Sequence, residues 1–83
     1  MNNAQQKSLP VVGKLYKNRG RDIHLNDGFG KLGAGSYVLV LGRRVGCVGE
    51  ILATVLVPRL GVVAHCSYWE KAGWDYWWEE VEL

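Results

Sequence analysis

Aromatic residues crowd toward the C-terminal end of this 83-residue chain. Six of its nine aromatic residues stand between positions 68 and 78, and these include all four tryptophans, at positions 69, 74, 77 and 78. Flat aromatic side chains stack on nucleobases, sugars and partner side chains, but they also build hydrophobic cores. The window therefore predicts either a tryptophan-rich core wall or a surface that binds a partner.

The spacing of the window is typical of a β-hairpin. Residues 70–73 form the expected turn, in which Gly73 supplies a positive φ. Placing Trp69 opposite Trp74 directs Tyr68 and Trp77 to the core and creates one aromatic row on the other face. The residues of this row that we expect to contact a protein partner are His65, Trp69, Trp74, Tyr76 and Trp78. Two alternatives stay open: the N-terminal strands cover the row as a second core layer, or a second copy of the chain buries it.

Basic residues offer a different chemistry. Residues 1–65 carry nine Lys or Arg against three Asp or Glu, whereas residues 66–83 carry one against five. Such asymmetry steers a charged partner toward one side, or makes the two segments attract each other. The alternative function is therefore nucleic-acid binding, in which phosphates would contact Lys14, Lys17, Arg19, Arg21, Arg43 and Arg44.

Motifs for catalysis, metals and cofactors are weak. Gly28 to Gly33 match the GxGxxG pattern of dinucleotide sites, but a strand and not a helix is expected after them. His24, His65, Cys47 and Cys66 lack ligand spacing, and the adjacent His65 and Cys66 point to opposite faces of a strand. We predict no catalytic, metal-binding or cofactor-binding residues, and a protein that is not an enzyme.

The two cysteines and the apolar runs indicate in which cellular compartment the protein is expected. In the expected register Cys47 and Cys66 lie too far apart for a disulfide, so buried free thiols are expected. The longest apolar run, residues 51–57, is far shorter than the ~20 residues of a membrane-spanning helix. With no secretory signal visible at the N-terminus, the sequence predicts a cytoplasmic protein that does not enter a membrane.

Glycines divide the chain into short runs rich in Val, Leu and Ile, a pattern typical of β-strands. We expect residues 1–8 to be a disordered tail and residues 9–83 to form one domain. The expected strands are Val11–Lys17, Asp22–Leu25, Ser36–Leu41, Val45–Val57, Gly61–Trp69 and Trp74–Val81. Short links between the last four indicate antiparallel neighbours, with Gly42-Arg43-Arg44 as one hairpin tip.

The predicted fold is therefore mainly β: a small, antiparallel, partly open barrel of the SH3-like or OB-like kind, with a C-terminal Trp-rich hairpin. An α+β alternative stays open, because residues 48–57 and 74–82 both repeat apolar residues at helical spacing. The predicted function is a non-catalytic accessory or inhibitory binding protein. It would contact a protein partner, or itself, through the aromatic hairpin.

Overall fold

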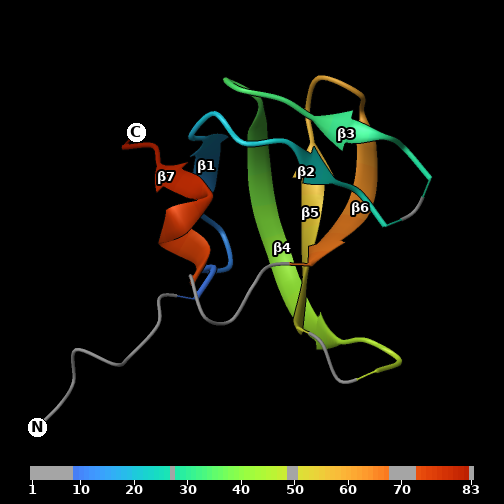
Figure 1. The fold of residues 1–83 in the computed structure, drawn as a ribbon. Helices are drawn as coiled ribbons and strands as arrows, with labels where there is room; N and C mark the ends of the chain where they lie inside the picture. Colours follow the sequence, from blue (N-terminus) through green and yellow to red (C-terminus); the bar gives the residue numbers. More distant parts are fainter. Residues whose placement is uncertain (1–8, 27, 49–50, 68–72, 83) are drawn as a thin grey trace, which may run out of the picture.

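The computed structural model describes residues 9–26, 28–48, 51–67 and 73–82, which form two antiparallel sheets (Figure 1). The larger sheet has five strands in the order β6-β5-β4-β1-β7, and the smaller is a two-stranded ribbon of β2 and β3. A short 3-10 turn, η2, precedes the last strand. The elements in chain order are β1 (Leu15–Asn18), β2 (Ile23–His24), β3 (Lys31–Leu32), β4 (Tyr37–Val45), β5 (Ile51–Val57), β6 (Val62–Ser67), η2 (Trp74–Tyr76) and β7 (Trp78–Glu80).

A tight link joins β5 to β6. The carbonyl of Val57 accepts hydrogen bonds from the backbone N–H groups of Leu60, at 3.1 Å, and Gly61, at 2.8 Å. Gly61 has a φ of 70°, a conformation that glycine adopts without the steric cost of a side chain. The turn places Val57 opposite Val62 and thereby fixes the register of the whole pair.

The predicted hairpin tip at residues 42–44 is wrong. β4 continues through these residues to Val45, and Gly42 lies opposite Thr54 of β5. The register shifts between Val40 and Gly42, which marks a β-bulge, so the glycine bends a long strand instead of ending it. The helical alternative for residues 48–57 is also wrong, because residues 51–57 are strand β5.

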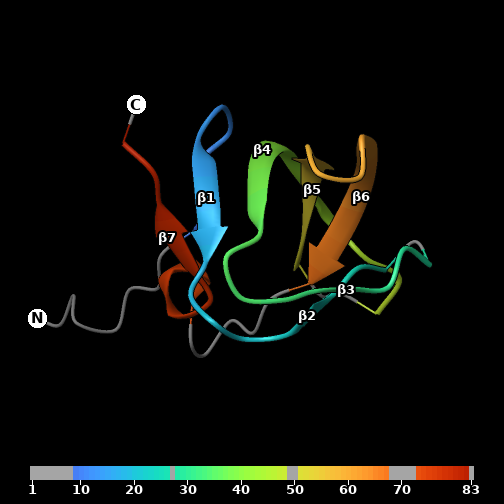
Figure 2. The same ribbon diagram turned by 90° about the horizontal axis from the view of Figure 1, so that it is seen from above.

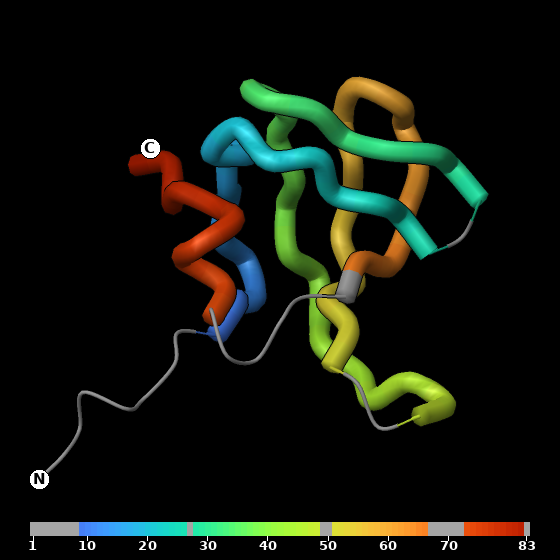
Figure 3. Tube along the Cα trace, in the orientation of Figure 1, coloured from blue at the N-terminus to red at the C-terminus, as the bar shows by residue number. Residues whose placement is uncertain are grey.

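The predicted C-terminal hairpin is wrong as well. β6 pairs with β5, whereas β7 lies at the opposite edge of the sheet and pairs with β1, with Asn18 opposite Trp78. In Figure 3 the blue N-terminal strand and the red C-terminal segment accordingly run side by side. The helical spacing at residues 74–82 reflects the three-residue η2 turn followed by a strand, and not a helix over the whole range.

The β2–β3 ribbon crosses one face of the large sheet, as the view in Figure 2 shows. It buries Ile23, Leu25 and Leu32 in the same core as the inward-facing residues of the sheet. The GxGxxG segment lies in this ribbon: the Leu25 N–H donates to the Gly30 carbonyl at 2.8 Å, and strand β3 follows. The glycines therefore belong to a β-ribbon, without the following helix that a dinucleotide site requires.

The fold prediction is confirmed at the level of a mainly β, antiparallel and open structure. In the described part of the chain the edge strands β6 and β7 do not pair with each other, so the sheet does not close into a barrel. Within the same residues, no helix is long and apolar enough to cross a membrane. The buried apolar residues come from both sheets and from η2: Tyr16, Ile23, Leu25, Leu32, Val38, Val40, Ala53, Val55, Val57, Ala64, Cys66, Trp74 and Trp78.

Candidate partner-binding surface

The η2 turn sorts the aromatic residues into two layers. Trp74 and Trp78 are both buried, with 0% and 1% of their surface exposed, and their rings stack with centroids 5.4 Å apart. The ring of Tyr16 on β1 meets Trp74 edge to face at 5.4 Å. Since such pairs add to the free energy gained by burial, this layer anchors the C-terminal segment to β1.

The second layer faces outward. Tyr76 has 44% of its surface exposed, and Trp77 is half-buried against it in an edge-to-face contact, with ring centroids 5.1 Å apart. The indole nitrogen of Trp77 is buried and donates to no acceptor in the part of the chain that the structure describes. Native proteins seldom leave a buried donor unsatisfied.

Arg21 completes this outer layer. Its guanidinium carbon lies 3.8 Å above the centre of the Tyr76 ring and 5.8 Å from the centre of the Trp77 ring. A cation over an aromatic face is attracted by the ring quadrupole, by about 0.5–1 kcal/mol at an exposed site. We call Arg21, Tyr76 and Trp77 the arginine–aromatic surface.

Asn18 holds the loop that carries Arg21. Its side chain is in the interior, where Oδ1 accepts from the N–H groups of Gly20 at 2.7 Å and Arg21 at 2.8 Å. Its Nδ2 donates to the carbonyls of Arg21, at 2.5 Å, and Leu32 of β3, at 3.2 Å. One side chain thus fixes the backbone on both sides of Arg21 and ties it to the ribbon.

Arg19 joins the same loop to the aromatic turn. Its Nε donates to the carbonyls of Asp75, at 2.7 Å, and Trp78, at 3.2 Å, and its backbone N–H donates to the Trp77 carbonyl at 3.0 Å. These bonds satisfy carbonyls within and just after the short η2 turn. Arg19 therefore has a structural role, whereas Arg21 stacks on the Tyr76 ring.

The predicted aromatic row does not form. Trp74 and Trp78 belong to the core and cannot contact a partner in the folded chain, because Tyr16 and the core cover them. Of the predicted set, Tyr76 is exposed, whereas the half-buried His65 lies on β6, three strands away from β1. Trp69 lies outside the described residues. A second copy of the chain is not needed to bury Trp74 and Trp78, because the N-terminal strand already does so.

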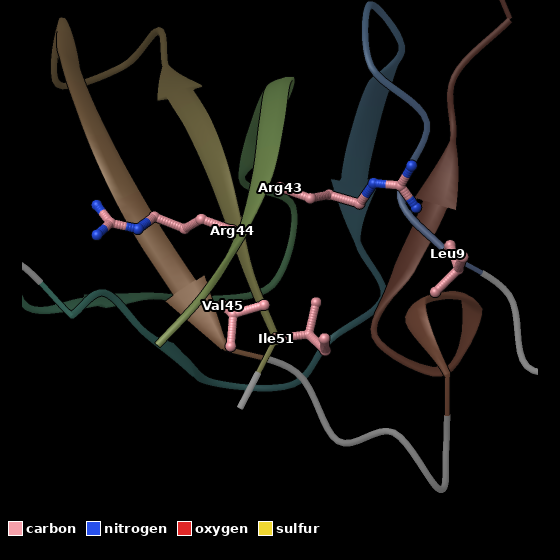
Figure 4. Close-up of a pocket in the computed structure, with 5 residues that line it drawn as sticks. All are labelled: Leu9, Arg43, Arg44, Val45 and Ile51. Atoms are coloured by element: carbon pink, nitrogen blue, oxygen red, sulfur yellow. The ribbon is translucent and has the colours of Figure 1, made fainter. Parts of the chain in front are cut away.

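The predicted nucleic-acid set is spread over the molecule. Lys14 pairs with Glu80 at 3.0 Å, and the hydrogen bond and charge of that carboxylate raise the pKa of Lys14. Lys17 lies opposite Glu79 of β7, and Arg19 donates to backbone carbonyls. Arg43 and Arg44 lie near the C-terminal end of β4 and point in opposite directions (Figure 4).

A surface pocket of about 240 Å³ opens beside those two arginines. Leu9, Val45 and Ile51 line it together with Arg43 and Arg44 (Figure 4). Pockets that hold drug-sized ligands are usually roughly 300–1,000 Å³ and largely enclosed. This one is smaller, and the described residues that line it are three apolar side chains and two arginines.

The cysteines are free, as expected, but only one is buried. Cys47 is exposed, whereas Cys66 lies in the core opposite Ala53, where burial raises the pKa of its thiol to about 12. A thiol with such a pKa is a poor nucleophile at neutral pH. Among the described residues, no three His, Cys, Asp or Glu side chains gather as a metal site would require.

The sequence predicts Arg21 as a phosphate contact and Tyr76 as part of a hairpin, and no local pattern connects the two residues. The two residues are 55 positions apart, and only the pairing of β1 with β7 brings them together. Their types gave a partial signal, since arginine and exposed aromatic residues are enriched at binding surfaces. A comparison with protein-family models, with curated proteins and with solved structures finds no match to this chain.

Proposed function

We propose that this protein is a non-catalytic binding domain, accessory or inhibitory in role, which contacts a protein partner through the arginine–aromatic surface. The observation that carries the proposal is the Arg21 guanidinium held 3.8 Å above the half-exposed Tyr76 ring. Arginine, tyrosine and tryptophan are enriched among the few residues that contribute most to binding at protein interfaces. Here both are positioned before a partner arrives, so less conformational entropy is lost on binding.

We also propose that the fold is SH3-like. Support comes from the strand order β6-β5-β4-β1-β7, from the ribbon that follows β1, and from the 3-10 turn before the last strand. Domains of that kind commonly dock extended peptides on exposed aromatic side chains. Because fold alone does not assign function, the proposal rests on the surface and not on the likeness.

The experiment is selection of a random peptide library on the immobilised chain. We expect enriched sequences that bind the unchanged protein and lose most of their affinity for the Tyr76→Ala variant. Tyr37→Ala is the matched control, because Tyr37 is equally exposed, at 43%, but lies on β4. Failure to enrich any sequence, or equal binding to both variants, would overturn the proposal.

Nucleic-acid binding is the competing outcome. It would require several phosphate contacts and would therefore weaken steeply with salt. Fluorescence anisotropy with a labelled single-stranded oligonucleotide at 20 and 200 mM salt measures this directly. Tight, salt-sensitive binding that Arg43→Ala and Arg44→Ala abolish would favour that function over the one proposed.

A further inference from the structure

Resting on the proposed function, we infer that the arginine–aromatic surface selects an acidic partner segment, and that Arg21 receives the carboxylate of an Asp or Glu side chain. The cation–π contact engages only the flat face of the guanidinium. Its N–H groups lie in the plane of the group and point outward from its edge. The contact thus orients the N–H donors of Arg21 and leaves them able to bind another group.

No described residue accepts those hydrogen bonds. In the described part of the chain, the Arg21 side chain contacts two aromatic rings, and the ion pairs are Lys14 with Glu80 and Lys31 with Asp22. The acid nearest in sequence, Asp22, is thus already engaged by another cation at 3.4 Å. Among the described residues, Arg21 is therefore an exposed and oriented cation without an ion-pair partner.

A second arginine of the same loop lies beside the η2 turn. Arg19, two residues away from Arg21, is exposed and directs its Nε toward the carbonyls of Asp75 and Trp78. A planar carboxylate matches the fork of an arginine, which binds it through two parallel hydrogen bonds. The exposed ring of Tyr76 supplies an apolar contact for the methylene groups of the same acidic side chain.

Asn18 acts as the positioning residue for this contact. Its four hydrogen bonds fix the backbone N–H and carbonyl of Arg21 from the interior. Replacement by aspartate keeps the acceptor for the two N–H groups but loses the two donated bonds. Replacement by alanine loses all four, so the two variants should displace Arg21 to different degrees.

The direct test is an NMR titration of the intact chain with N-acetylglutamate methylamide, and with the glutamine compound as the neutral control. We expect the Arg21 side-chain Nε–H signal to shift and to saturate at millimolar acidic ligand, with a response at least about tenfold weaker for the amide. Followed at the Tyr76 ring signals, which both chains contain, Arg21→Lys should lose most of the difference, because an ammonium lacks the fork. Arg59→Ala, at an exposed turn, is the control that should keep it.

The outcomes separate the inference from the proposed function. Enriched peptides that require Tyr76 but show no preference for acid would leave the function standing and overturn the inference. Equal shifts with both compounds would also overturn it, as would a stronger response to inorganic phosphate than to the carboxylate. In Asn18→Ala the ring-current shift of the Arg21 side-chain protons should diminish; its full retention would remove the positioning role.

Discussion

Trp74 and Tyr76 stand two residues apart in one turn, yet one has no exposed surface and the other has 44% of its surface exposed. In a strand, residues two apart share a face, which is why both were assigned to one row. In the 3-10 turn successive side chains project about 120° apart, so the two leave in different directions. The local backbone, and not residue type, decides which aromatic residues are core and which are surface.

Replacing the inner residue should have the largest effect. Trp74→Ala removes a fully buried indole that stacks on Trp78 and contacts Tyr16, and we expect it to lower the free energy of unfolding by about 3–5 kcal/mol. Chemical denaturation measures this change. Tyr76→Ala should cost under about 1 kcal/mol, and equal losses for the two variants would break the distinction between the layers.

The second-largest loss of stability is expected from replacing Asn18, which supports the outer layer. Asn18→Ala deletes four hydrogen bonds from a buried side chain, each with a net contribution of about 0.5–1.5 kcal/mol. We expect a loss of about 2–4 kcal/mol in denaturant unfolding. Asn18→Asp, which keeps the acceptor oxygen, should be less damaging than alanine at neutral pH; a larger loss would show that a carboxylate buried against the carbonyls of Arg21 and Leu32 costs more than the two accepted bonds contribute.

The two cysteines allow the same comparison between a buried and an exposed residue. The pKa of buried Cys66 is raised to about 12 from an ordinary 9.0, so above pH 9 the unfolded chain loses this proton while the folded chain keeps it. Stability from this group is therefore complete below pH 9 and falls by about 1.4 kcal/mol per pH unit up to about pH 12.

Cys66→Ala should flatten that dependence when denaturation is measured at pH 8, 9.5 and 10.5. Comparison with the unchanged chain cancels the titration of its tyrosines and lysines. Cys47→Ala serves as the matched control, because Cys47 is exposed. Parallel pH profiles for the unchanged chain and Cys66→Ala would contradict the assigned burial.

The smallest effect is expected at the cation–π contact. Arg21→Ala should lower the free energy of unfolding by no more than about 1 kcal/mol, since the pair is exposed. Thermal unfolding of the single and double variants with Tyr76→Ala isolates the coupling between the two side chains. A loss comparable with that of Trp74→Ala would move Arg21 from the surface to the structural framework.

Much of the sheet was predictable from the sequence. The expected strands at residues 36–41 and 61–69 overlap β4 and β6, because alternating or continuous runs of Val, Leu and Ile fit a half-buried pleated surface. Gly42 was misread as a turn, because a glycine in a bulge and a glycine in a hairpin have the same sequence signature. The third strand, Lys31–Leu32, is too short to produce an alternating pattern.

The sequence by itself determined that the protein is small and mainly β, that its two thiols are free and that most of its aromatic residues lie near the C-terminus. It could not determine which of those residues face outward, because β7 pairs with β1 across some sixty residues and no local pattern encodes that pairing. Tertiary structure alone buried Trp74 against Tyr16 and placed Arg21 on Tyr76. Local backbone preferences act over a few residues, whereas the choice of strand partner depends on how the whole sheet buries its apolar surface.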